Sequence, residues 1–130
     1  MIVDEAWLVM REPAGASFLH RLAKSARKRW CGLTTITQDA GDLLATELGH
    51  AVVANAATQI LLRQAPQAID RLREAFRLTD GECRYLLTAP RGHGLFVVGD
   101  ERFPLRILAS PEEHAYATSD PAELAAEPER

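Results

Sequence analysis

The chain has 130 residues and a mass of 14.3 kDa, which is enough for one domain with a hydrophobic core but not for two. Hydrophobic residues make up 47% of it and charged residues 25%, as in ordinary globular domains, and its apolar runs are too short to span a membrane. The formal net charge of −3, with acids concentrated in the last 20 residues, gives no indication of direct nucleic-acid binding. Cys31 and Cys83 form no C-x-x-C pair, so we expect no metal site built on them.

The first five residues, Met1-Ile2-Val3-Asp4-Glu5, are an apolar run that ends in two adjacent carboxylates. This pattern is typical of the second nucleotide motif of P-loop ATPases, Walker B, in which a buried strand delivers one acid to Mg²⁺ and the next to the attacking water. The partner motif, G-x-x-x-x-G-K-[ST], is absent, because neither lysine of the chain, Lys24 or Lys28, follows a glycine. We interpret the sequence as half of an ATP site and expect the chain alone to be inactive.

The next segments predict a β-α-β unit. Apolar residues recur at three- and four-residue spacing after Pro13, which predicts an amphipathic helix over about 14–28. The β-branched segment 33–37, preceded by Gly32, predicts a second strand. A strand, a helix and a strand with short connections imply a parallel pair with a right-handed crossover.

The rest of the chain alternates helical and strand patterns. We expect two short helices over 39–46 and 49–56, broken at Gly49, and a third strand over 58–62. Capping boxes at 79–82 and 110–113 predict the starts of two later helices. The remaining expected elements are a helix from Pro66 to about 77, a β-hairpin of 95–98 and 103–108 joined by a solvated turn at 99–102, and an acidic, disordered tail at 119–130.

Each of the three predicted strands ends in a polar residue suited to phosphate chemistry. Asp4 and Glu5 follow the first, Gln38 the second and Arg63 the third. Because ligands of parallel sheets bind beyond the carboxyl ends of the strands, these side chains would hold Mg²⁺, orient a water and bind γ-phosphate oxygens. The alternative is that strands simply end at the protein surface, where polar residues are common.

Arg27 precedes the second strand and therefore lies at the opposite end of it. Five residues at about 3.3 Å each place it roughly 16 Å from the edge that carries Gln38, too far to serve its own site. In a ring of subunits it could act on a neighbour's nucleotide as an arginine finger. The alternative is a solvated cation that complements the helix dipole.

Five segments of the sequence resemble the C-terminal half of the conjugative-transfer ATPases of type IV secretion systems, of the TraC/CagE type. They are VDEAWLVM, AKSARKRWCGLTTITQD, ANAATQILLRQ, LTDGECRYLL and RGHGLFVVGDERFPLRILASPEEH. The resemblance runs from residue 1 to about 121 and implies an α/β fold, part of a RecA-like P-loop motor related to the FtsK and HerA translocases. It also implies ATP and Mg²⁺ as cofactors of the intact parent site, a hexameric ring as its assembly, and a cytoplasmic position at the inner membrane.

The resemblance also suggests roles for individual residues. Asp4 matches the Mg²⁺-side acid of Walker B, Glu5 the catalytic base and Gln38 the γ-phosphate sensor. Arg27 matches the arginine that related translocases offer to the adjacent subunit, and Arg63 a family arginine that would bind nucleotide. The strand that bears the phosphate loop is missing, and in such folds it lies between the strands that end at Gln38 and Arg63.

We therefore expect residues 1–118 to be the part of a P-loop ATPase domain from Walker B onward. Its function would be that of a motor fragment that uses ATP hydrolysis to power DNA or protein transfer. Its partners would be neighbouring ring subunits and inner-membrane components of the secretion system. The alternative is a non-catalytic remnant or interaction module that associates with an intact secretion ATPase. We expect Trp7 and Trp30 to be packing residues rather than platforms for stacking bases.

Overall fold

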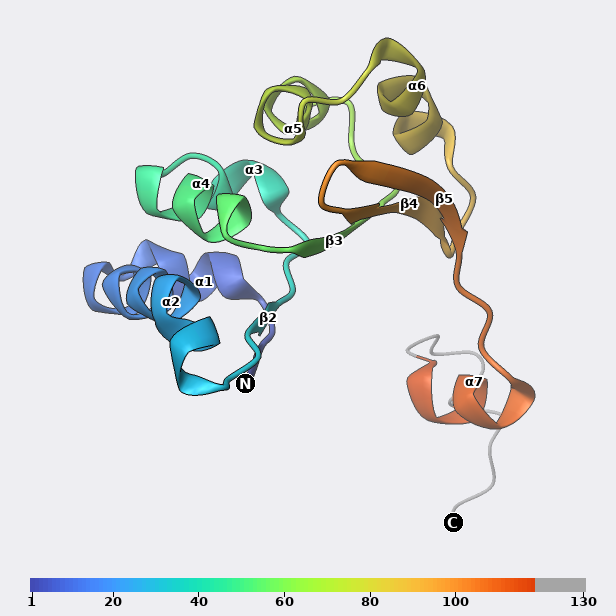
Figure 1. The fold of residues 1–130 in the computed structure, drawn as a ribbon. Coiled ribbons are helices and arrows are strands. Elements are labelled where there is room, and N and C mark those ends of the chain that lie inside the picture. The colour runs from blue at the N-terminus through green and yellow to red at the C-terminus, as the bar shows by residue number, and fades with distance from the viewer. Residues whose placement is uncertain (119–130) are drawn as a thin grey trace.

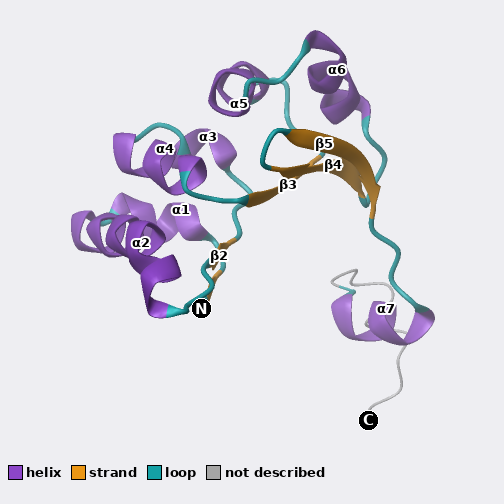
Figure 2. Ribbon diagram, in the orientation of Figure 1, coloured by secondary structure: helices purple, strands orange, loops and turns teal. Residues whose placement is uncertain are grey.

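A computed structural model describes residues 1–118 of the chain. Their strands form two separate sheets, and helices pack on both (Figures 1 and 2). The first sheet is the parallel pair β1–β2, and the second is antiparallel with the strand order β3-β4-β5. The predicted acidic tail, 119–130, lies outside the described residues. No helix within residues 1–118 is both long and apolar enough to cross a bilayer.

The N-terminal half contains the predicted β-α-β unit. Strand β1 (Ile2–Val3) pairs in parallel with β2 (Thr34–Thr35), with Ile2 opposite Thr34. The elements between and after them are α1 (Ala6–Arg11), α2 (Pro13–Ser25), the 3₁₀ helix η1 (Ala26–Arg29), α3 (Ala40–Leu43) and α4 (Glu47–Ala54). Pro13 occupies the first turn of α2, where its missing N–H leaves no intrahelical bond unmade.

The C-terminal half is built on the second sheet. Its strands are β3 (Thr58–Leu62), β4 (His93–Val98) and β5 (Glu101–Arg106), and its helices are α5 (Ile69–Phe76) and α6 (Asp80–Thr88). Figure 1 shows α5 and α6 over one face of this sheet, with α7 (Pro111–Ala117) beyond the end of β5. Both predicted capping boxes are present, at Thr79–Glu82 and Ser110–Glu113.

Each half has its own hydrophobic cluster. Met10, Ala16, Leu19, Leu43 and Val52 form the N-terminal cluster. The C-terminal cluster consists of Leu44, Leu61, Leu72, Leu78, Cys83, Leu86 and Leu95. Leu43, the last residue of α3, and Leu44, its C-cap, belong to different clusters, so the two halves meet at the end of this one-turn helix. Both cysteines are free thiols; Cys83 is buried and Cys31 is partly exposed.

Several sequence-based expectations differ from the structure in detail. The break between α3 and α4 lies at residues 44–46, and Gly49 is inside α4. Glycine is required at this position because a β-carbon would collide with the Leu43 carbonyl oxygen, not because the helix ends there. Helix α5 begins at Ile69, after a turn that contains Pro66. Helix α1 was not expected, and Ile2 of the expected buried strand is exposed.

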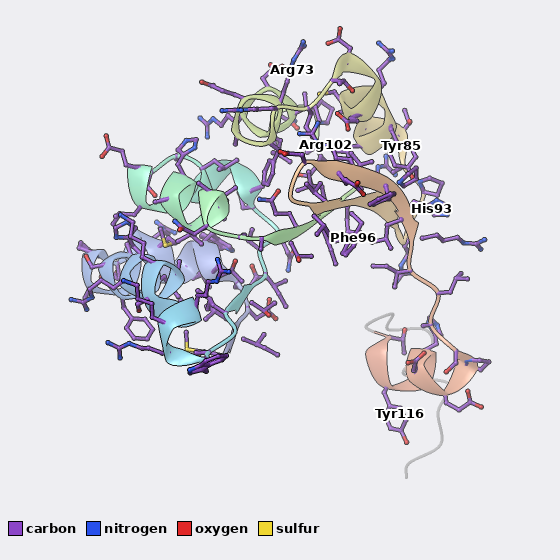
Figure 3. All side chains as sticks on the ribbon, viewed as in Figure 1. Arg73, Tyr85, His93, Phe96, Arg102 and Tyr116 are labelled. Carbon is purple, nitrogen blue, oxygen red and sulfur yellow. The ribbon has the colours of Figure 1, made fainter. Side chains whose placement is uncertain are left out.

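The hairpin turn is shorter than predicted. Only Gly99 and Asp100 connect β4 to β5, because Val98 already pairs with Glu101. Gly99 has a φ of 58°, a left-handed value that glycine adopts without strain. The expectation of a solvated turn is wrong for Arg102, which lies between β5 and the two helices above it (Figure 3). Its guanidinium donates to the Phe76 carbonyl oxygen at 2.6 Å and to the Glu82 carboxylate at 3.1 Å.

Candidate functional site

The predicted acid and amide at the ends of β1 and β2 are in direct contact. Because the two strands are parallel and in register, the residues that follow them emerge at the same edge of the sheet. The Gln38 side-chain nitrogen donates a hydrogen bond to Glu5 Oε1. The edge is closed locally by two backbone bonds, from the Ala6 amide to the Ile36 carbonyl and from the Ile36 amide to the Val3 carbonyl, both of 2.8 Å. The parallel register thus brings together two residues 33 positions apart.

Glu5 has a backbone conformation that is rare for its residue type. Its φ and ψ are both 47°, in the left-handed region, at the position directly before α1. Such a conformation costs a non-glycine residue on the order of 1 kcal/mol, and residues of this kind cluster at functional sites. The turn it makes ends β1 and directs the Glu5 carboxylate back toward Gln38. We take the strain as support for a functional role of Glu5.

Trp7 is a residue of the candidate site that sequence reasoning missed. Its indole Nε1 donates to Glu5 Oε2 at 2.7 Å, so the two carboxylate oxygens of Glu5 are held by two different donors. The Arg11 guanidinium lies 5.7 Å from the centre of the Trp7 ring, within the range of a cation–π contact. Trp7 is half-buried as expected of a packing residue, but its polar atom belongs to the site. The only sequence signal for this contact was the order D-E-x-W, in which Trp7 follows Glu5 by two residues.

Asp4 is the residue at this edge best suited to a divalent cation. It is exposed, and its Oδ1 accepts the Glu5 amide at 2.8 Å. One carboxylate together with substrate phosphates and waters is a usual ligand set for Mg²⁺. The donor set here therefore fits Mg²⁺ only alongside a bound nucleotide, and no three His, Cys, Asp or Glu side chains converge on a metal position within residues 1–118.

Arg27 lies far from this edge. It is the second residue of η1, exposed, and it precedes β2 rather than following it. The structure therefore agrees with the expectation that Arg27 does not approach its own Glu5 and Gln38. Two other cations of η1, Lys28 and Arg29, are exposed beside it.

Arg63 is not brought to the same sheet as the other predicted site residues. It follows β3, which pairs with β4 and not with β2, so the expectation of three strand ends at one continuous edge is not met. The physical reason is that the carboxyl ends of two strands share an edge only when the strands belong to one hydrogen-bonded sheet. β2 and β3 belong to different sheets. In the family that the sequence resembles, the strand bearing the phosphate loop lies between the strands that end at Gln38 and Arg63. The separation of β2 from β3 agrees with the absence of that strand from this sequence.

An arginine that the sequence did not single out links the two halves at this place. Arg71 of α5 donates from Nη1 to the carbonyl oxygen of Gly41 in α3, at 3.1 Å. Helix α3 begins immediately after Gln38 and Asp39, and Asp39 caps it by accepting the Asp42 amide at 2.8 Å. The segment that carries Gln38 is therefore tied to the C-terminal half. A shallow cavity of about 480 Å³ on α5, lined by residues that include Asp70 and Arg77, lies outside this edge.

Comparisons with known proteins agree with this geometry. The model of the TraG P-loop domain family matches residues 1–93. The chain is also similar to the solved structure of VirB4 from Thermoanaerobacter pseudethanolicus, with a TM-score of 0.78 and 34% sequence identity. That match covers 86% of this chain and 31% of the VirB4 chain, so the sequence spans about a third of the protein it resembles. No match was found among curated proteins.

These two similarities confirm the predicted resemblance to the conjugative-transfer ATPases and the partial α/β P-loop fold. The family match extends over more than two thirds of the chain and includes the β1–β2 edge, α5 and α6. The chain belongs to the TraG P-loop domain family.

Proposed function

We propose that this chain supplies the Walker B, sensor and arginine-finger residues of an ATPase that powers type IV secretion or conjugative transfer. The observation that carries the proposal is the hydrogen bond between Gln38 and Glu5, which links a carboxylate and an amide at the exit edge of two parallel strands. If the strands merely ended in polar residues at the surface, we would not expect two side chains to donate to the Glu5 carboxylate.

Each residue has a role that follows from its chemistry. Asp4 would hold Mg²⁺ directly or through a water, and Mg²⁺ neutralises charge that develops on the β- and γ-phosphates. Glu5 would orient the attacking water and accept its proton. The Gln38 amide has two N–H groups, so while one holds Glu5 the other can donate to a γ-phosphate oxygen. The Gln38 side chain would thereby contact the γ-phosphate as the sensor and also position Glu5 as the base.

The remaining phosphate contacts must come from outside this sequence, which contains no phosphate loop. In P-loop proteins the backbone amides and lysine of that loop hold most of the phosphate oxygens. We propose that a strand bearing the loop lies between β2 and β3, which are unpaired with each other. It would bring Arg63 to the edge that carries Gln38. The alternative is a non-catalytic module that associates with an intact secretion ATPase at the inner membrane. Only the absence of the phosphate loop favours this alternative.

The test of the catalytic proposal is Glu5→Gln in a parent protein that contains the phosphate loop. We expect ATP hydrolysis to fall by at least about a hundredfold, because the substitution removes the proton acceptor. ATP binding should remain, because glutamine keeps the size of the side chain and one oxygen that can still accept from either Trp7 or Gln38. Measured turnover and nucleotide affinity separate the two effects. Hydrolysis at the wild-type rate in this variant would show that Glu5 is not the base.

We further propose that Arg27 acts on a neighbouring subunit's nucleotide. Arg27→Ala in the parent should lower turnover by about a thousandfold, the range of arginine fingers, without loss of fold. The decisive measurement mixes this variant with Glu5→Gln. Each is inactive alone, but in a mixed assembly an intact Glu5 can meet an intact Arg27, so part of the activity should return. No recovery in a mixture shown to co-assemble would leave Arg27 as a helix-end cation.

A further inference from the structure

Gln38 lies in a tight turn that leads directly into the one-turn helix α3. The Thr37 hydroxyl donates to the Asp39 carbonyl oxygen and accepts the Asp39 amide, both at 3.2 Å, so it bridges the two residues that flank Gln38. Asp39 in turn caps α3 by accepting the Asp42 amide at 2.8 Å. The backbone of Gln38 is therefore fixed to α3, and a displacement of α3 would move the Gln38 side chain relative to Glu5.

Helix α3 needs support from elsewhere in the molecule. It has four residues, and an isolated single turn is unstable in water. Its last turn also leaves one carbonyl without the usual partner. The Ala45 amide donates to the Asp42 carbonyl oxygen at 3.2 Å, whereas in a continuing α-helix it would donate to Gly41. Because Gly41 is buried, its carbonyl oxygen requires another donor.

Arg71 of α5 supplies this donor, since its Nη1 lies 3.1 Å from the Gly41 carbonyl oxygen. A β-carbon on Gly41 would lie 3.2 Å from Asp39 Oδ1 and 3.7 Å from Arg71 Nη1. The carboxylate that caps the start of α3 and the guanidinium that holds its carbonyl therefore flank the same small residue. Helices α3 and α5 are in contact (Figure 1), and Arg71 brings the C-terminal half to within one helical turn of Gln38.

Apolar packing joins α3 to the C-terminal half as well. Leu44 belongs to the C-terminal cluster, and Ala40 packs against it. Apolar burial is non-directional, whereas a hydrogen bond weakens steeply when its distance or angle departs from the preferred values. Packing thus keeps α3 against the C-terminal half, and the Arg71 bond selects the orientation in which Gly41 faces α5.

We propose that Arg71 is a positioning residue for the γ-phosphate sensor. Through the Gly41 carbonyl it holds α3 where the Gln38 amide reaches Glu5. This inference rests on the proposed function, in which Gln38 is the sensor and Glu5 the base. It adds that a residue of the C-terminal half, 30 positions after Gly41, controls how well the site hydrolyses ATP.

The first experiment follows the Gln38 side-chain amide of the 130-residue chain by NMR, without nucleotide. Its signal is assigned by its loss in Gln38→Ala. Arg71→Ala should shift this signal toward that of a solvated glutamine, because the bond to Glu5 loses its fixed geometry. The matched control is Arg73→Ala, which removes another exposed arginine of α5. Arg73 pairs with Asp80, so its loss should leave the Gln38 signal in place.

The two tryptophans are internal references for this measurement. The Trp7 indole N–H donates to Glu5 within the N-terminal half, so in Arg71→Ala its signal should shift much less than that of Gln38. Trp30 is 99% exposed, so the expectation that it packs within this chain is wrong, and its indole signal should not move. Equal shifts of all three signals would overturn the proposal, because Arg71 would then support the whole N-terminal half. An unchanged Gln38 signal would also overturn it.

The second experiment measures hydrolysis in a parent protein that contains the phosphate loop. Arg71→Ala should lower kcat about 10- to 100-fold, because the sensor and the base are misplaced. Affinity for ADP should not change, since ADP lacks the γ-phosphate that Gln38 would contact. Arg71→Lys should restore most of the turnover, because the ammonium group can also donate to the Gly41 carbonyl. Arg73→Ala is again the control and should leave kcat unchanged.

A double-mutant cycle separates positioning from a general loss of stability. If Arg71 acts through Gln38, Arg71→Ala should lower kcat much less in a Gln38→Ala background than in the wild type. An equal loss in both backgrounds would overturn the proposal, and so would wild-type turnover in Arg71→Ala.

A failure of the proposed function gives a different result, because the NMR measurement uses no nucleotide. If Glu5→Gln hydrolyses ATP at the wild-type rate while Arg71→Ala still shifts the Gln38 signal, the positioning contact stands and the catalytic assignment fails. If Glu5→Gln is inactive and Arg71→Ala shifts no signal, the catalytic assignment stands and the role of Arg71 is wrong.

Discussion

At the scale of single residues, the candidate site depends on one carboxylate with both oxygens engaged. Glu5 receives the Gln38 amide on Oε1 and the Trp7 indole N–H on Oε2. The prediction that Glu5 and Gln38 lie together followed from the strand ends in the sequence. The role of Trp7 did not, because its indole reaches back to Glu5 only after the left-handed turn at that residue. No sequence pattern predicts a left-handed backbone conformation at a glutamate.

Trp7→Phe in a loop-containing parent tests whether the indole positions the proposed base. Phenylalanine keeps the ring against Arg11 but removes the donor to Glu5 Oε2. A hydrogen bond to a charged group contributes about 1.5 to 3 kcal/mol, so we expect turnover to fall about 10- to 100-fold with ATP affinity little changed.

The control for this prediction is the same change in the Glu5→Gln background. If Trp7 acts only through the Glu5 carboxylate, Trp7→Phe should lower the residual turnover of that background by much less than it lowers the wild type. An equal loss in both backgrounds would mean that Trp7 contributes through packing.

At the scale of elements, the start of α6 is the best-determined junction of the C-terminal half. The Glu82 carboxylate accepts the Thr79 amide at 2.7 Å, which completes the capping box, and also the Arg102 guanidinium from β5. Arg102 in turn donates to the Arg77 carbonyl oxygen at 3.0 Å, at the end of α5. One ion pair therefore joins two helix ends to the hairpin. The side chains of Arg102 and Glu82 are 26% and 19% exposed.

This junction predicts a pH-dependent stability. Partial burial raises the pKa of Glu82, but the hydrogen bonds from Thr79 and the charge of Arg102 outweigh it, so the pKa of Glu82 lies below its ordinary value. A carboxylate with a lowered folded-state pKa stabilises the fold above its unfolded-state pKa, and this contribution disappears as pH falls through the folded-state pKa.

Glu82→Gln should therefore destabilise the chain by about 1 to 2 kcal/mol at pH 7, because it removes the charge that Arg102 and the helix start require. At about pH 3, below the ordinary glutamate pKa, the difference between wild type and variant should shrink, since the stability from a carboxylate with a lowered pKa is lost as pH falls toward that pKa. Urea unfolding at the two pH values measures both differences. A gap that is constant with pH would contradict the role assigned to the charge of Glu82.

Most elements were predictable because their signals are local. Capping boxes marked α6 and α7, a three- to four-residue apolar period marked α2, a β-branched run marked β2 and an apolar run marked β3. Helix α1 was missed because its N-cap residue, Glu5, makes no side-chain cap and its six residues are too few for a clear period. Strand β2 is shorter than the β-branched run 33–37 predicts, since only β1 pairs with it. Strand pairing is non-local, so no local pattern marked the separation of β2 from β3, and only the family resemblance implied a strand between them.

At the scale of the whole molecule, the described residues form two packed units that share few contacts. No strand pairing joins the sheets; the junction includes α3 against α5, where Arg71 holds the Gly41 carbonyl, and Val53 of α4, which packs against both hydrophobic clusters. On the uncovered face of the second sheet, Ile60, Phe96 and Phe103 lie side by side across three strands. Ile60 and Phe103 are both half-exposed. This chain covers 31% of the VirB4 chain that it matches.

The two units should consequently open independently of each other. Leu19, 1% exposed, belongs to the N-terminal cluster, and Leu72, 0% exposed, to the C-terminal one. Truncation of either to alanine should cost its own unit about 2 to 5 kcal/mol. Native-state amide hydrogen exchange measures where the cost appears. Leu19→Ala should lower protection in α2 and α4 but leave β3 to β5 as in the wild type, and Leu72→Ala should do the reverse. Equal loss of protection throughout the chain in both variants would mean that α3 and Arg71 couple the two units into one cooperative fold.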